Sequence, residues 1–531
     1  MIRKLLNKKR IFIVVLVLLL VFASYGCGKK KGPQVDPIDD NYRVMYQIFV
    51  GSFSDSDGDE IGDLRGIINR LDYLNDGNIN SGESLGVQGL WLSPIFFSPT
   101  YHKYDARDYY KIDPYFGTMD DLIELVEECH KRNVIVILDL VLNHTSNQHE
   151  WFKQFVKAHQ NGDTSNKYYN YYSYFKKGEW GSGVGVSQIS GTDEYYECTF
   201  SSGMPELNYD NPEVRSEMLK VAKYYLDLGI DGFRFDAIKY IYYGDTKKCV
   251  DFWNWYMGEL KEIKPDVYCV GEDWAADPEV IKYNEALNCF NFTMSQGEGL
   301  VSLTAKQGNV NTFTNYVESF IKSIKAKNSD AIFTPFITNH DMDRAAGFLL
   351  VSLTYNMHMA ANLNILQNGS PFIYYGEEIG MKGSRGSSNT DANRRLGMLW
   401  GDGDTIGDPE GTTYQKKNQT NGTVKEQLEN ENSLLNYYKR LIAIRNNNPE
   451  IARGEYKSLN LADTKVGGFT ATYNGSTVCV VHNTTEEEVT IDLSLATNFN
   501  FTKIQDYIGQ GKCKLEGTKL TIGAFTSCVL K

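Results

Sequence analysis

Eight short apolar runs, separated by stretches with helical periodicity, are the feature that most restricts the fold of this chain. Two of the helical stretches are Met119–Arg132 and Pro212–Leu228. Alternation of strand and helix is typical of a parallel sheet, and eight such units predict a closed (β/α)₈ barrel, an α/β TIM barrel. The expected strands are Val44–Phe49, Gly89–Leu92, Val134–Leu140, Gly232–Phe235, Val267–Gly271, Cys289–Phe292, Phe333–Ile337 and Phe372–Tyr375.

Two segments depart from this alternation. Residues 145–208, after the third strand, are rich in Tyr, Gly, Ser and Asn, and a structureless loop of that length is uncommon, so we expect an inserted subdomain B. Residues 449–531 contain short β runs separated by turn residues, which predicts a C-terminal antiparallel β-sandwich. The catalytic barrel would then comprise residues 42–144 and 209–448.

The N-terminus has the pattern of an export signal. A basic start precedes the apolar run Ile11–Phe22, which is shorter than the roughly 20 residues that span a bilayer. The segment that ends in Cys27 resembles the lipobox of bacterial lipoproteins, which implies a signal peptide over 1–26 and lipidation of Cys27. Residues 27–41 would form a polar tether, so we expect a secreted, membrane-attached lipoprotein on a bacterial cell surface. An uncleaved signal anchor is the alternative.

Composition narrows the partners and the role of cysteine. The net charge is −13, so nucleic acid is not expected as a partner, because phosphate binding needs a basic face. The chain has 35 Tyr, and amphipathic rings suit flat ligands such as sugars. After Cys27 the cysteines form no CxxC pair and no zinc spacing, so buried thiols are expected, with a Cys513–Cys528 disulfide left open.

Charged and polar residues stand at the ends of four predicted strands. The segments are Asp139–His144, Gly232–Lys239, Val270–Glu272 and Ile337–Asp341. Carboxylates that meet at one barrel mouth repel one another, which raises at least one pKa. Glycoside hydrolysis needs that difference, because one group acts as an acid while a carboxylate attacks or stabilises the sugar cation. Arg234 would keep Asp236 ionised, since residues two apart share a strand face, and Glu272 follows apolar residues.

These four segments resemble the signature regions of glycoside hydrolase family 13, the α-amylase family. The segments Tyr101–Tyr104, Met204–Asn208 and Gly369–Glu378 match as well. The resemblance runs from about Tyr42 to the end of the chain and implies Asp236 as nucleophile, Glu272 as general acid/base and Asp341 as a third carboxylate that binds sugar hydroxyls. It also implies binding of an α-glucan or maltooligosaccharide by His102, Tyr104, His144, Arg234, Lys239, Tyr240, His340 and Arg344.

An acidic loop follows the first strand. Alternating acidic side chains and one backbone carbonyl are the ligands that Ca²⁺ takes from a single loop. Glu60 and Gly66 stand where an EF-hand has its turn glycine and bidentate glutamate, so a complete EF-hand is not expected. The segment resembles the calcium loop of oligo-1,6-glucosidase-like members, which implies Ca²⁺ held by Asp55, Asp57, Asp59, the Ile61 carbonyl and Asp63.

Three functions compete. Ala237 follows the nucleophile where α-1,6-specific members of the family carry Val, which favours a retaining enzyme that cleaves α-1,4-glucosidic bonds of starch or maltooligosaccharides. Met204–Asn208 resembles a group intermediate between oligo-1,6-glucosidases and neopullulanases, so α-1,6 cleavage or glucosyl transfer stays open. A membrane-anchored scaffold that has lost catalysis is disfavoured, because Asp236, Glu272 and Asp341 are all present.

Overall fold

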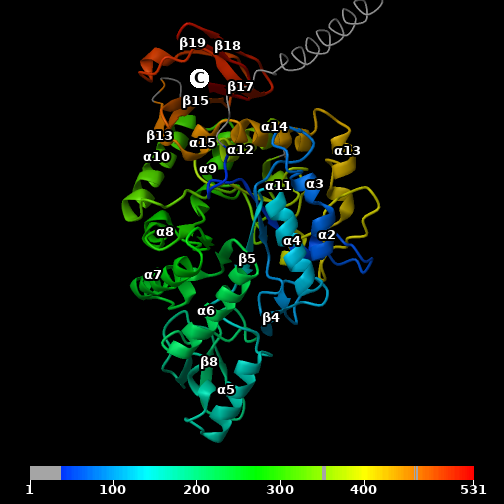
Figure 1. Cartoon of the computed structure of the whole chain (residues 1–531), viewed down its shortest axis with the longest axis vertical. Helices are drawn as coiled ribbons and strands as arrows, with labels where there is room; N and C mark the ends of the chain where they lie inside the picture. The colour runs from blue at the N-terminus through cyan, green and yellow to red at the C-terminus, as the bar shows by residue number, and fades with distance from the viewer. Residues whose placement is uncertain (1–36, 350–353, 460, 462–464) are drawn as a thin grey trace, which may run out of the picture. The chain divides into compact units, whose positions relative to one another are not determined.

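The computed structural model describes residues 37–349, 354–459, 461 and 465–531. Its main sheet is parallel, and its strand order is β11-β10-β9-β5-β2-β1-β12 (Figure 1). The bounds are β1 Met45–Ile48, β2 Gly89–Leu92, β5 Ile135–Leu140, β9 Gly232–Phe235, β10 Tyr268–Gly271, β11 Asn288–Cys289 and β12 Phe372–Tyr374.

The sheet closes through the segment 333–337, which the sequence predicted as the seventh strand. Phe290 bridges Thr334 on one side, and Phe336 bridges Phe372 on the other, both in parallel. Pro335 stands between them without an N–H, so it cannot donate to either neighbouring strand. The predicted (β/α)₈ barrel is confirmed, and its seventh strand is reduced to two isolated bridges.

Nearly every barrel strand contributes an apolar side chain to the barrel interior. The cluster there includes Met45, Trp91, Ile137, Tyr268, Val270, Phe290, Phe336 and Phe372. On β9 the fully buried side chain of Arg234 lies between register partners Asp139 of β5 and Val270 of β10. A buried guanidinium needs anionic partners, so the barrel places a charged centre inside an apolar core.

Helices cover the outer face of the barrel. Helix α4 is capped at its start by Thr118, whose side chain accepts from the Asp121 N–H in a capping box, and α6 begins with Pro212 after the cap Asn211. The α-helices outside the segment 145–208 are α2 Leu64–Asn69, α3 Leu71–Leu74, α4 Met119–Lys131, α6 Pro212–Asp227, α7 Thr246–Ile263, α8 Asp277–Tyr283, α9 Leu300–Ala305, α10 Val310–Lys327, α11 Ala345–Leu349, α12 Thr354–Ile365, α13 Val424–Leu428, α14 Leu434–Asn446 and α15 Pro449–Arg453.

The segment 145–208 folds into a helix and a small sheet. Helix α5 spans Glu150–Asn161 and ends at Gly162 in a left-handed conformation. Strands β6 Tyr174–Lys176, β8 Glu194–Glu197 and β7 Val186–Gln188 form an antiparallel sheet in that order, while β3 Phe96–Phe97 and β4 Asp108–Ile112 pair nearby in sequence. A bridge between His144 and Glu206 ties the two ends of the segment together.

The C-terminal strands form two antiparallel sheets. One has the order β13-β14-β15-β20-β17 and the other β16-β19-β18. A separate apolar cluster that includes Val481, Ile491, Leu520 and Cys528 joins them, as a sandwich requires. The bounds are β13 Glu455–Ser458, β14 Val466–Tyr473, β15 Ser476–Asn483, β16 Val489–Asp492, β17 Ile504–Gly509, β18 Cys513–Glu516, β19 Lys519–Ile522 and β20 Thr526–Leu530.

The signal peptide and Cys27 lie outside the described residues. Lipidation of Cys27 therefore stays a prediction, and incorporation of labelled palmitate that is lost in Cys27→Ser would test it. Among the described residues, no helix is long and apolar enough to cross a membrane. The eight cysteines in this part of the chain are free thiols, Cys513 and Cys528 included.

Candidate active site

Strands β5, β9 and β10 bring three carboxylates to one guanidinium. Arg234 donates from Nη1 to Asp236 Oδ1 at 2.7 Å, and its Nη2 lies 3.0 Å from Glu272 Oε2. The side chains of Asp236 and Glu272 are each 13% exposed, so a ligand can still reach both. The Ala237 N–H also donates to Glu272 Oε2, at 3.2 Å. The two sequence-predicted reacting carboxylates are thus held by the same cation.

Asp139 is a member of this centre that the sequence analysis quoted in a motif but did not assign to the site. Both of its oxygens lie 2.9 Å from Arg234 Nη1. Its Oδ2 also accepts from Tyr104 Oη at 2.8 Å and from the Trp91 ring N–H at 3.3 Å. Asp139 is fully buried, so it positions Arg234 and Tyr104 from beneath rather than contacting substrate.

Burial and charge set the protonation of the reacting pair. Burial raises the pKa of Glu272, Arg234 opposes the rise, and the negative charges of Asp236 and Asp341 add to it. Burial also raises the pKa of Asp236, against the direct hydrogen bond from Arg234. Because Asp236 accepts the shorter contact, we expect Asp236 to lose its proton first and Glu272 to retain one, which is the division that acid–nucleophile catalysis requires.

A second set of contacts joins His340, Asp341 and Arg395. The Gln47 amide lies 2.7 Å from His340 Nδ1, so the ring proton is assigned to Nε2, which lies 3.0 Å from Asp341 Oδ2 and 2.6 Å from Tyr104 Oη. Burial lowers the pKa of His340, which keeps its ring neutral near pH 7. Arg395 Nη2 donates to the other oxygen of Asp341 at 2.7 Å.

The ionised form of the Asp341 carboxyl group is strongly favoured. Desolvation raises its pKa, but the hydrogen bond from His340 and the Arg395 cation outweigh that effect and hold the pKa well below its usual range. Its side chain is 32% exposed, the most of the three predicted catalytic carboxylates. Arg395 was missed in the sequence because no motif marks it. It lies beyond β12 and reaches back to the His340 carbonyl and the Tyr101 hydroxyl.

The remaining predicted binding residues, apart from Arg344, have contacts that fit a binding role. Tyr104 stacks on His340 with ring centroids 5.4 Å apart, and burial lowers the pKa of His102 to about 3 and that of His144 to about 4. The Nε2 atom of His144 is buried without a hydrogen-bond partner among the described residues, which suits a group that awaits a ligand. Lys239 donates to the Trp274 carbonyl at 2.8 Å, and Tyr240 packs against Phe200.

Arg344 is not brought together with these residues. Its Nη1 donates to the Tyr375 carbonyl at 2.6 Å, and its guanidinium lies over the rings of Tyr374 and Tyr375. The side chain is buried against this segment. The resemblance named Arg344 as a substrate-binding residue, but in the structure it is Arg395 that contacts Asp341.

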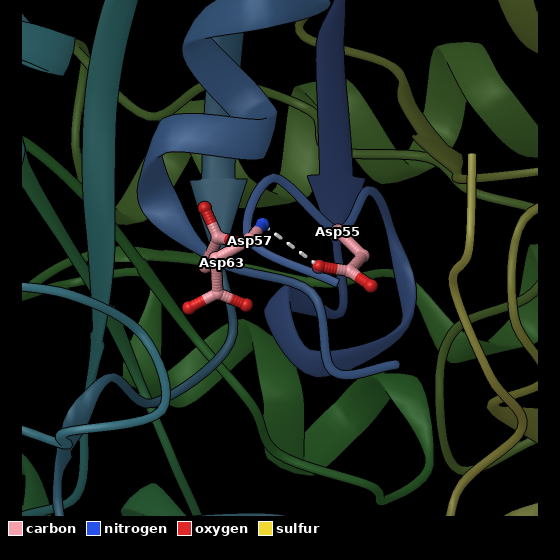
Figure 2. Close-up of side chains that lie close together, drawn as sticks. All are labelled: Asp55, Asp57 and Asp63. Atoms are coloured by element: carbon pink, nitrogen blue, oxygen red, sulfur yellow. Dashed lines mark hydrogen bonds between the residues drawn. The ribbon is translucent and has the colours of Figure 1, made fainter. Parts of the chain in front are cut away.

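The acidic loop gathers three of its predicted ligands. Asp55, Asp57 and Asp63 each offer an oxygen, and these oxygens lie within 4.8 Å of one another (Figure 2). Asp63 also caps α2, where it accepts from the Gly66 N–H. Asp59 accepts from the Ile61 N–H and is not among the three. A group of carboxylate oxygens at this spacing fits a hard cation such as Ca²⁺.

Comparison with known proteins matches both parts of the chain. Residues 47–454 match the family model described as alpha amylase, catalytic domain, and residues 466–529 match the alpha-amylase SusG C-terminal domain. Alpha-amylase 3 of Dictyoglomus thermophilum is 34% identical and covers 92% of this chain and 93% of its own. An oligo-1,6-glucosidase of Bacillus cereus is 32% identical over 85% of this chain and 91% of its own.

Solved structures agree. Amy13B of Eubacterium rectale is 36% identical, with a TM-score of 0.85, and the match covers 94% of this chain and 97% of that one. The alpha-amylase from H. orenii is 35% identical, with a TM-score of 0.79 and coverage of 92% and 99%. With the family model matching most of the chain and the carboxylates gathered at the barrel mouth, the chain belongs to the α-amylase family, glycoside hydrolase family 13, and is a glycoside hydrolase with a SusG-like C-terminal domain.

Proposed function

We propose that this enzyme hydrolyses α-1,4-glucosidic bonds of starch or maltooligosaccharides with retention of the anomeric centre. The observation that carries the proposal is the shared guanidinium, because Asp236 and Glu272 both contact Arg234, at 2.7 and 3.0 Å. Two carboxyl groups held by one side chain leave little room for a water between them. Retaining enzymes have their carboxyl groups about 5–5.5 Å apart, whereas inverting enzymes need about 6.5–9.5 Å.

The reaction then runs in two displacements. Asp236 attacks the anomeric carbon while Glu272 gives its proton to the glycosidic oxygen, so the old C–O bond breaks and the shortened glucan leaves. Glu272, now a carboxylate, takes a proton from water, whose oxygen attacks the same carbon and releases Asp236. Asp341 accepts hydrogen bonds from the sugar hydroxyls, and its fixed charge favours the positive ring of the transition state.

Ala237 supports the α-1,4 assignment. It is buried next to the nucleophile, and its backbone is left-handed, with φ 51°. Its methyl group is small, which leaves room for an acceptor sugar beside Glu272. The name of the Dictyoglomus relative favours the same bond, while the name of the Bacillus relative favours α-1,6 bonds as the second candidate.

The bond preference is tested by paired rates. We expect wild type to cleave maltotriose at least about tenfold faster than isomaltotriose, since tenfold corresponds to about 1.4 kcal/mol of differential transition-state binding. Ala237→Val should move the ratio toward isomaltotriose. A β-branched residue at positive φ is strained, by about 1–2 kcal/mol, so the melting temperature should fall as well.

Ala237→Gly serves as the matched control, because glycine tolerates the left-handed backbone and leaves the space open. It should keep the wild-type preference for maltotriose. Equal wild-type rates on the two sugars would refute the α-1,4 assignment and favour the α-1,6 candidate.

The acidic loop completes the proposal. Asp55, Asp57 and Asp63 would hold Ca²⁺, which would fix the loop between β1 and α2, away from the reacting carboxylates. The side chain of Asp57 is the exposed member of the three, so its removal disturbs the loop least. Metal bound only by the folded state stabilises it by about 2.7 kcal/mol at a hundredfold excess over the dissociation constant.

Chelation and substitution should therefore have the same effect. Treatment with EDTA is expected to lower the melting temperature of wild type by about 5 °C. Asp57→Asn should begin near the chelated value and should not respond to EDTA. Asp266→Asn, at a side chain that is 80% exposed, should behave as wild type. A wild-type melting temperature that is the same with EDTA and with excess calcium would contradict the site.

A further inference from the structure

Three aromatic rings form a line away from the catalytic centre on the side of Tyr240. We call Phe200, Tyr240 and Tyr243 the acceptor strip. Tyr240 and Tyr243 stack with centroids 4.9 Å apart and planes within 2° of parallel. Phe200 lies 4.7 Å from Tyr240 and 5.5 Å from His144. Ring contacts therefore run without a break from His144, a predicted substrate-binding residue, through Phe200 and Tyr240 to Tyr243.

The outer rings of the strip are open to solvent. Phe200 is 46% exposed and Tyr243 is 42% exposed. Large exposed rings that stack on one another, instead of packing into the core, are typical of binding surfaces. A hexose offers an apolar face to such a ring and hydroxyls at its edge, so a tyrosine in this position contacts both parts of the sugar.

A cavity of about 390 Å³ adjoins the strip. That volume lies within the range of roughly 300–1,000 Å³ that is usual for small-molecule sites. Its polar lining can exchange hydrogen bonds with sugar hydroxyls, through the carboxyl of Glu279 and the hydroxyls of Ser182 and Thr246. The full lining is Ser182, Lys239, Tyr240, Tyr243, Gly244, Thr246, Glu279 and Tyr283.

The strip is supported from the inserted segment. Gly183 has φ +85°, and a Cβ placed there would lie 3.4 Å from both Cε1 and Oη of Tyr243. The loop around Gly183 therefore lies beside the Tyr243 ring. Two distant parts of the chain, 182–200 and 239–246, together build this surface.

Lys239 links the strip to the chemistry. Its ammonium group donates to the carbonyl of Trp274, which is two residues after Glu272. Ala237, three residues before Tyr240, donates its N–H to Glu272 Oε2 at 3.2 Å. The strip thus begins in the segment that contacts Glu272, the group proposed to protonate the leaving oxygen.

We propose that the acceptor strip and the adjoining cavity bind the second and third glucosyl units of the leaving chain. This rests on the proposed hydrolysis of α-glucans. It implies that the enzyme prefers chains long enough to cover Tyr243, and that maltooligosaccharides compete with water for the glycosyl-enzyme. When a maltooligosaccharide takes the place of water, its 4-hydroxyl loses its proton to Glu272 and its oxygen displaces Asp236 from the glycosyl-enzyme.

The test compares a long substrate with one that has no leaving chain. An aryl α-maltoside places only its aryl group beyond the cleaved bond, whereas maltoheptaose can cover the strip. Tyr243→Ala should lower the ratio of kcat/KM for maltoheptaose to that for the aryl maltoside about tenfold. Tyr243→Phe should keep the ratio, because the ring remains. Tyr507→Ala, at a tyrosine that is 45% exposed on β17, should keep it as well.

The outcomes separate the two proposals. An unchanged ratio in Tyr243→Ala, with wild type active on maltoheptaose, overturns the strip and leaves the hydrolase assignment intact. Wild type inactive on maltooligosaccharides but active on isomaltooligosaccharides overturns the bond assignment, and the same ratio is then measured on the α-1,6 series. Added maltotriose should also increase transfer products in wild type several-fold more than in Tyr243→Ala. Equal transfer yields would count against the strip.

Discussion

Asp236→Asn is expected to reduce turnover about 10⁴-fold or more, because the amide cannot form the glycosyl-enzyme. Asn keeps the shape of the side chain and a hydrogen-bond acceptor for Arg234, which now contacts Asp236 at 2.7 Å, so the protein should still fold. Turnover of maltooligosaccharides and the melting temperature should be measured together. An active Asp236→Asn variant would show that another group is the nucleophile.

Glu272→Gln should be equally severe on natural glucans but milder on aryl glucosides with activated leaving groups. Those substrates need little protonation in the first step. In Glu272→Ala, azide should restore turnover of such substrates, since a small anion attacks the glycosyl-enzyme without a general base. Proton NMR of the first product gives the stereochemistry. The α-anomer should appear first, and the β-anomer appearing first would exclude the double displacement.

Arg395→Met is expected to lower kcat/KM about 10²–10³-fold, the cost of removing one charge-assisted contact at a transition state. The substitution leaves Asp341 without the guanidinium that now lies 2.7 Å away. Arg395 helps to hold the pKa of Asp341 below its usual range, so its loss should raise that pKa. Because Asp341 must be ionised to act, the acidic limb of the pH–rate profile should move to higher pH.

Arg395→Lys separates charge from geometry. It restores a cation but not the fork that also reaches the Tyr101 hydroxyl, so it should recover the position of the acidic limb better than it recovers kcat/KM. Arg344→Met is the comparison, since that guanidinium lies against Tyr374 and Tyr375. Arg344→Met should lower the melting temperature and leave the KM for maltooligosaccharides close to that of wild type. An unchanged pH profile in Arg395→Met would contradict the role given to Arg395.

The parts of this protein that the sequence predicts best are those with a repeated local pattern. Apolar runs predicted six of the barrel strands to within one residue at each end, because a buried parallel strand needs an unbroken apolar stretch. The exceptions are β11, which ends three residues earlier than predicted, and the segment 333–337, which forms only two bridges. Acidic residues directly after those runs predicted which side chains meet, because the carboxyl ends of barrel strands share one face. Asp236 and Glu272 follow from this rule, and Arg234, inside β9, holds them together in the structure.

Contacts between distant loops leave no such pattern. Arg395 belongs to a 3₁₀ turn and loop after β12, and nothing in its neighbourhood indicates that it reaches Asp341, 54 residues earlier. The resemblance implied that Arg344 binds substrate, yet its side chain donates to the Tyr375 carbonyl. Asp139 precedes the strand end and is fully buried, so its importance appears only when its partners Arg234 and Tyr104 are known.

The segment 333–337 pairs with the neighbouring strands only through two isolated bridges, at Thr334 and Phe336. Strands β9 and β10, which carry Asp236 and Glu272, pair along four consecutive registers. His340 and Asp341 instead follow the segment 333–337 within four residues. Amide hydrogen exchange should accordingly begin at 333–337, where local opening breaks few backbone bonds. Asp236 and Glu272, the proposed reacting pair, thus follow two strands that pair along their whole length, whereas Asp341, the proposed sugar-binding carboxylate, follows a segment that pairs through two bridges.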